Sequence, residues 1–123
     1  MNEKLLFICY PKCTTCQKAQ KWLEDHGIAY ELRNIKEQNP TIEELAAWWE
    51  KSHVPLRKFF NTSGMLYKSL ALKDKLGAMA DKEQLALLAT DGMLVKRPLV
   101  ISNNKVLVGF KEAEWETLTM RNN

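Results

Sequence analysis

Two cysteines, two residues apart, stand where an apolar segment gives way to a stretch with helical periodicity. Cys13 and Cys16 follow the apolar run of residues 5–10. The first N–H groups of a helix have no intrahelical acceptor and carry partial positive charge, which favours a thiolate there. A second thiol one turn further on is placed to attack a mixed disulfide formed at the first. The spacing predicts a redox-active dithiol, with Cys13 as the nucleophile and Cys16 as the resolving thiol.

Other interpretations of the cysteines are open. Each can be a small buried hydrophobic residue. A structural zinc ion requires four ligands, and the remaining candidates, Cys9, His26 and His53, occur singly, which disfavours zinc. We therefore predict neither a metal nor a cofactor. Cys9 is interpreted as a core residue, because strand alternation does not place it beside the start of the helix.

Three neighbours of the cysteines are predicted to contact the substrate. Lys12 adds positive charge beside the first cysteine. Thr14 and Thr15 occupy the first helical positions, where the backbone N–H groups are available as donors. The sequence therefore predicts an electropositive turn around the dithiol.

Pro98 interrupts an apolar hairpin late in the chain. A proline there must escape the hydrogen-bonded ladder, and a cis peptide bond is one way to do so. The preceding residue, Arg97, would favour a nearby thiolate and could hold an oxyanion by two parallel hydrogen bonds. The alternative is an exposed arginine at the end of a strand. We assign Arg97 to catalysis and Pro98 to substrate binding.

The first segments of the chain predict a βαβ unit. Residues 4–10 form a short apolar strand, residues 14–26 have helical period, and Gly27 stands where a C-terminal cap belongs. Residues 28–32 predict a second strand. Strand, helix and strand within about thirty residues imply parallel strands.

The middle of the chain predicts helices alone. Thr41 and Glu44 have the spacing of a capping box, and residues 53–90 remain helical but are interrupted by proline and glycine. We therefore expect several short helices, with Asp81 capping the last. Residues 41–90 together predict one all-helical insertion.

The last part of the chain predicts a β-hairpin and a closing helix. Residues 93–95 and 99–102 have strand character, and residues 106–110 follow a turn. Residues 111–120 predict the closing helix. The order of elements predicts an α/β, thioredoxin-like mixed sheet with a helical subdomain inserted between its halves.

The length allows one domain of residues 1–123, with a thioredoxin-like part of residues 1–40 and 91–123 and a helical insert of residues 41–90. The net charge is +3, and 18 basic residues are mixed with 15 acidic ones, so no basic stripe indicates direct nucleic-acid binding. Because no apolar run approaches a membrane span of about 20 residues, we expect no membrane partner and a cytoplasmic location. Three cysteines in a reducing compartment do not form a disulfide framework.

Four features in order resemble the arsenate reductase/Spx family over nearly the full chain. They are the Cys13–Cys16 pair, the helical middle, residues 56–62 and residues 96–99. The resemblance implies a thioredoxin-like fold with a helical insert, Cys13 as the nucleophilic cysteine and Arg97 as the arginine before a cis-proline. The family contains glutaredoxin-dependent arsenate reductases and Spx-type regulators that bind the RNA polymerase α subunit. The two-cysteine pattern looks more like the Spx branch.

Two functions follow as hypotheses. In the first, the chain is a thiol-disulfide oxidoreductase whose dithiol is regenerated by glutathione, another low-molecular-weight thiol, glutaredoxin or thioredoxin. In the second, it is a redox-sensing regulator that docks on the RNA polymerase α subunit through the helical insert. Adjacent Trp48 and Trp49 motivate the second, because both cannot face inward on one helix. We favour the enzyme.

Overall fold

Four strands form one mixed sheet in the computed structural model, which describes residues 4–119. The strands are β1 (Leu5–Cys9), β2 (Tyr30–Asn34), β3 (Leu99–Ile101) and β4 (Val106–Val108), in the spatial order β2-β1-β3-β4. β1 pairs with β2 in parallel, and the β1–β3 and β3–β4 pairs are antiparallel. The cysteine turn follows β1, one of the two central strands.

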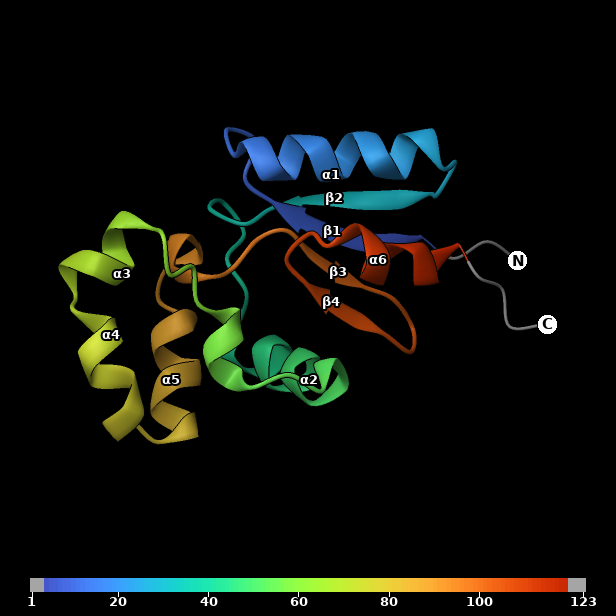
Figure 1. Ribbon diagram of the computed structural model, residues 1–123. Helices are drawn as coiled ribbons and strands as arrows, with labels where there is room; N and C mark the ends of the chain where they lie inside the picture. The colour runs from blue at the N-terminus through green and yellow to red at the C-terminus, as the bar shows by residue number, and fades with distance from the viewer. Residues whose placement is uncertain (1–3, 120–123) are drawn as a thin grey trace.

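Helices cover both faces of the sheet (Figure 1). α1 (Thr14–Asp25) and α6 (Glu112–Trp115) pack on one face, where Phe7 and Trp115 are fully buried. The inserted helices pack on the other, against Ile8. Because successive strand residues point to opposite faces, β1 contributes to both hydrophobic cores. This arrangement confirms the predicted thioredoxin-like α/β fold with a helical insertion.

The insertion consists of short helices. They are α2 (Ile42–Ser52), α3 (Met65–Ser69), α4 (Leu72–Lys75) and α5 (Asp81–Leu88), with 3-10 turns at Leu56–Phe59, Leu76–Ala78 and Gly92–Leu94. Thr41 begins α2 with the predicted capping box, in which the Glu44 amide donates to the Thr41 hydroxyl at 3.1 Å. None of the helices within residues 4–119 is long and apolar enough to cross a membrane.

Backbone hydrogen bonds attach the insertion to the segment that leads to Arg97. The Asn61 amide donates to the Leu94 carbonyl at 2.8 Å, and the Lys96 amide donates to the Phe59 carbonyl at 2.7 Å. Between them, Phe60 and Val95 form an isolated antiparallel bridge. Residues far apart in the chain are therefore fixed beside each other on one side of the cysteine turn.

Two element boundaries differ from the sequence-based expectation for a local reason. The second strand begins at Tyr30, because the Ile28 amide donates to the Leu23 carbonyl at 3.0 Å and completes the end of α1. The predicted strand at residues 93–95 is a 3-10 turn, because the Asp91 carboxylate accepts a hydrogen bond from the Met93 amide at 2.8 Å.

Two helix ends also differ from the expectation. Ala80 is the N-cap residue of α5 and Asp81 is its first residue, with the Glu83 carboxylate accepting from the Ala80 amide at 2.8 Å. The closing helix is α6, followed by a 3-10 turn at Glu116–Leu118. Its predicted end at residue 120 lies outside the described residues.

Candidate active site

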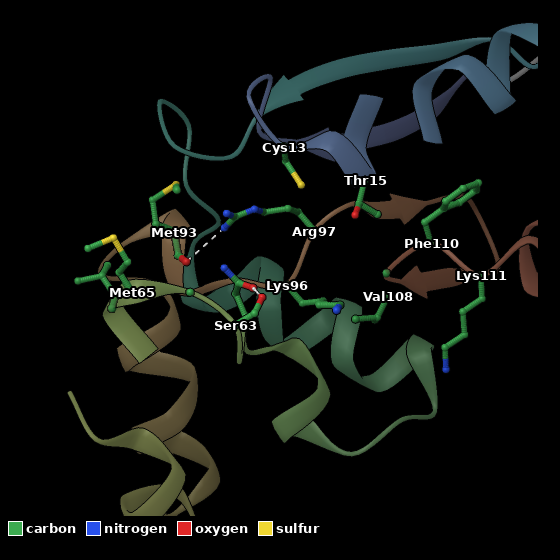
Figure 2. A pocket seen from close by; sticks show the side chains of 14 residues that line it. Cys13, Thr15, Ser63, Met65, Met93, Lys96, Arg97, Val108, Phe110 and Lys111 are labelled. Carbon is green, nitrogen blue, oxygen red and sulfur yellow. Dashed lines mark hydrogen bonds between the residues drawn. The ribbon is translucent and has the colours of Figure 1, made fainter. Parts of the chain in front are cut away.

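Cys13 is the N-cap residue of α1 (Thr14–Asp25). Its backbone is extended, with φ −86° and ψ 121°. The Cys13 amide donates to the Tyr10 carbonyl at 2.9 Å, and its carbonyl accepts from the Gln17 amide at 3.0 Å. The sulfur atom points into an open cavity (Figure 2). A thiolate at this position meets the positive end of α1.

Cys16 lies behind Cys13 in the protein interior, where only 2% of its surface is exposed. Its sulfur accepts a hydrogen bond from the Tyr10 amide at 3.3 Å. Cys9 lies in the same buried cluster, and Cys13 packs against it. The hydrogen bond with Cys9, together with burial, raises the pKa of the Cys16 thiol above its ordinary value. The two thiols therefore differ: one opens to the cavity and the other is buried and keeps its proton.

Arg97 lies opposite the cysteine turn, and the Arg97–Pro98 peptide bond is cis. Its guanidinium carbon is 5.5 Å from the centre of the Tyr10 ring, a cation–π contact. Its Nη1 donates to the Met93 carbonyl at 3.3 Å (Figure 2). These two contacts orient a half-buried cation at the edge of the cavity that Cys13 enters.

The cavity has a volume of about 590 Å³ and lies between the cysteine turn, the insertion and the start of α6. Three cations line it: Lys96, Arg97 and Lys111. None of the residues 4–119 that line it carries a carboxylate. Its apolar side chains include Met65, Met93, Val108 and Phe110 (Figure 2). Such a site favours a ligand that carries negative charge beside an apolar part.

The structure brings three of the predicted site residues to this cavity: Cys13, Thr15 and Arg97. Cys16 is buried beneath the first of them. Lys12 and Thr14 are exposed at the turn, outside the set that lines the cavity. Pro98 is buried, and its carbonyl accepts from the Gly109 amide at 2.9 Å, so it holds the hairpin behind the site.

Sequence reasoning missed several residues that line the cavity. Lys96 lines the cavity beside Gly109. A Cβ added to this glycine would lie 3.2 Å from the Lys96 Cε. Lys111 reaches it from the start of α6. Met65 lies at its rim with 87% of its surface exposed. The usable signal was the pair of basic residues before Pro98, since adjacent cations beside a cis-proline turn indicate more than one charge at the site.

Cys9 is a core residue, as predicted, but the reason given for separating it from the helix start was wrong. Leu5, Phe7 and Cys9 share one face of β1, and that face is the one covered by α1. Alternation therefore brings Cys9 to the first turn of the helix. Cys9 is 3% exposed and lies in the same buried cluster as Cys16.

Fold and site define a thioredoxin-like α/β protein with a dithiol at its first strand-to-helix turn. The chain belongs to the ArsC family, whose sequence model it matches over residues 9–118. It is 58% identical over 112 residues to the uncharacterized protein YusI of Bacillus subtilis (strain 168), covering 91% of this chain and 95% of that protein. It is 31% identical over 121 residues to the regulatory protein MgsR of the same organism, covering 98% and 94%.

Solved structures give the same assignment. An ArsC family related protein from Bacteroides fragilis superimposes with a TM-score of 0.93 at 57% identity, covering 96% of this chain and 99% of that one. The possible arsenate reductase from Streptococcus mutans UA159 gives a TM-score of 0.87 at 42% identity, covering 97% of this chain and 100% of that one. An arsenate reductase from Vibrio cholerae gives a TM-score of 0.79 at 26% identity, covering 89% of this chain and 92% of that one. The predicted family is therefore confirmed, and the chain is a member of a family of thiol redox proteins.

Proposed function

We propose that the protein is a thiol-disulfide oxidoreductase that reduces an oxidised, negatively charged substrate. The Cys13 thiolate attacks one sulfur of a substrate disulfide, and the other sulfur leaves as a thiolate. The Cys16 thiol loses its proton to solvent and attacks the sulfur of Cys13, which releases the second half of the substrate. The product is a Cys13–Cys16 disulfide, which glutathione, another low-molecular-weight thiol, glutaredoxin or thioredoxin then reduces.

One observation carries this proposal: the two sulfurs are adjacent but only one of them opens to the cavity. Cys13 points into the space where a substrate would lie, and Cys16 is 2% exposed beside it. An outside disulfide therefore meets Cys13 first. The raised pKa of Cys16 keeps this thiol protonated, so it does not compete for the initial attack.

The charges of the cavity support the substrate class. Arg97, Lys96 and Lys111 line the cavity that the Cys13 sulfur enters. Carboxylates or an oxyanion on the substrate would pair with these cations, and Arg97 is able to hold two oxygens at once. Small anionic disulfides such as oxidised glutathione carry such groups.

Turnover with oxidised glutathione, an oxidised protein and arsenate, each with thiol reductants, tests the proposal. We expect Cys13→Ser to abolish turnover. We expect Cys16→Ser to stop after the first attack and to accumulate a mixed disulfide at Cys13, detected by mass spectrometry. Equal turnover of wild type and Cys13→Ser would contradict the proposal.

The names of two relatives favour a second function, a redox-switched regulator. The chain is similar to MgsR, and it is 27% identical to the global transcriptional regulator Spx of Staphylococcus aureus, covering 85% of this chain and 78% of that protein. On the insertion, Trp48 is buried, whereas Trp49 lines a shallow apolar pocket with His53. Pull-down of the RNA polymerase α subunit with reduced and oxidised protein tests this function. Capture that depends on the redox state would favour the regulator. Without such capture, the thiol-disulfide oxidoreductase remains the proposed function.

A further inference from the structure

Three thiols, not two, meet at the start of α1. Cys9 and Cys16 belong to the same buried core cluster, and Cys13 packs against it from the cavity side. Cys16 is the middle member: it shares the buried cluster with Cys9, its sulfur accepts from the amide of Tyr10, the residue next to Cys9, and Cys13 covers the cluster from outside. Cys9 is 3% exposed, so a reagent in solution does not reach it directly. Any disulfide chemistry at Cys9 must therefore pass through Cys16.

We propose that Cys9 is the third member of an internal thiol relay, which moves the disulfide from Cys13–Cys16 to Cys9–Cys16. The relay rests on the proposed function, because that function supplies the first disulfide. Thioredoxin-type chemistry needs two thiols, and a third one in contact with the resolving sulfur extends it by one exchange.

The exchange is balanced without another reactant. The Cys9 thiol attacks the sulfur of Cys16, and its proton passes to solvent by way of the Cys13 sulfur, which opens to the cavity. A Cys9–Cys16 bond forms, the Cys13–Cys16 bond breaks, and Cys13 leaves with the electron pair as a thiolate. One disulfide is present before and after, so no net oxidation occurs. The leaving sulfur is the one at the N-terminus of α1, where the helix amides carry partial positive charge.

The surroundings of Cys9 favour the attacking role. Cys9 lies in the same buried core cluster as Cys16, so the sulfur that it would attack is close to it. After the exchange, the oxidising equivalent lies in the interior and Cys13 again faces the cavity. The relay therefore lets Cys13 react with a second oxidised molecule, and reduction of the buried disulfide proceeds by the reverse path through Cys13.

Counting the thiolate released from a chromogenic disulfide tests the relay. Reduced native protein is mixed with excess dithiobis(nitrobenzoate), and released thionitrobenzoate is measured by absorbance. We expect wild type to release about three equivalents: from attack by Cys13, from resolution by Cys16, and from a second attack by the freed Cys13. We expect Cys9→Ala to stop at about two and Cys16→Ser at about one.

Each outcome of this count decides the question. Equal release by wild type and Cys9→Ala overturns the relay while leaving the proposed function in place. Release beyond the first equivalent by Cys16→Ser shows that Cys9 reacts without Cys16 and also overturns the relay. A wild type that stops at the first equivalent overturns resolution by Cys16, and with it both proposals.

Peptide mapping provides a second measurement on the wild-type protein, which does not depend on the folding of a variant. Trypsin cleaves after Lys12, so Cys9 lies in the peptide of residues 5–12, and both other cysteines lie in that of residues 13–18. A Cys13–Cys16 disulfide stays within one peptide, whereas a Cys9–Cys16 disulfide joins the two. We expect the joined peptides, with thionitrobenzoate on Cys13. Finding only the internal disulfide would overturn the relay.

Discussion

The guanidinium of Arg97 lies over the ring of Tyr10, with its carbon atom 5.5 Å from the ring centre. Tyr10 also directs the cysteine turn, because its amide donates to the Cys16 sulfur and its carbonyl accepts from the Cys13 amide. One residue thus contacts the cation, the Cys16 thiol and the backbone of Cys13. Changes to its ring should alter the position of the Arg97 guanidinium without altering the backbone hydrogen bonds to the two cysteines.

Replacing the Tyr10 ring should therefore affect the reaction through Arg97. We expect Tyr10→Leu to lower kcat/KM about fivefold, because loss of a cation–π contact of about 1 kcal/mol releases the guanidinium. Tyr10→Phe keeps the ring face and should stay near the wild-type value. Steady-state kinetics measure the change, and the thionitrobenzoate count should remain the same in both variants. A similar loss in Tyr10→Phe would indicate a role for the hydroxyl instead.

Charge in the cavity should control the affinity for substrate. We expect Lys111→Gln to raise KM severalfold for an anionic disulfide and to leave KM for a neutral disulfide unchanged, because Lys111 lines the cavity. Added salt should reduce the difference, since it screens exposed charges. Lys73→Gln, on the exposed side of α4, is the matched control. Equal effects at the two positions would exclude a specific contact.

Local patterns were sufficient to predict much of the fold. The capping box at Thr41, the positive φ of 65° at Gly27 and the cysteine turn all follow from short-range chemistry and are present. The 3-10 turn at Gly92–Leu94 was not predicted, because its apolar residues fit a strand equally well and the Asp91 side chain decides between them.

The candidate site was predictable where its residues belong to a short motif, namely the cysteine pair or Arg97–Pro98. Cys13 and Cys16 were found from their spacing, but Lys96 and Lys111 reach the same cavity from segments that come together only in the folded chain. The position of Cys9 beside Cys16 was missed for a related reason. The face of β1 that α1 covers depends on the path of the chain between them, which alternation alone does not give.

Gly92 should tolerate no side chain. An added Cβ would lie 1.8 Å from the Ile35 carbonyl oxygen, where the backbone of another segment leaves no space. We expect Gly92→Ala to lower the free energy of unfolding by about 3 kcal/mol through this overlap. A Cβ at Gly77 meets nothing within 4 Å, so Gly77→Ala should leave stability unchanged or raise it by up to about 1 kcal/mol. Urea denaturation of both variants measures the contrast, and equal stabilities would contradict it.

The ion pair between Arg33 and Glu44 should make stability depend on pH in acid. Arg33 Nη1 donates to Glu44 Oε2 at 2.8 Å and its Nη2 donates to Oε1 at 2.9 Å, joining β2 to the start of α2. The hydrogen bonds from Arg33 lower the pKa of Glu44 from 4.5 to about 2. The Glu44 side chain is 35% exposed, so solvent screening limits the contribution to about 1 kcal/mol.

A carboxylate whose pKa is lower in the folded chain stabilises that chain above the unfolded pKa, and the effect is lost as pH falls through the folded one. We therefore expect Glu44→Gln to be less stable than wild type at neutral pH, by about 1 kcal/mol. The difference should shrink as pH falls from about 5 toward 2. Glu43→Gln, an exposed neighbour in the same helical turn, should show no such convergence. Urea denaturation across this pH range measures the difference, and a constant gap would show that Glu44 acts through packing and not through its charge.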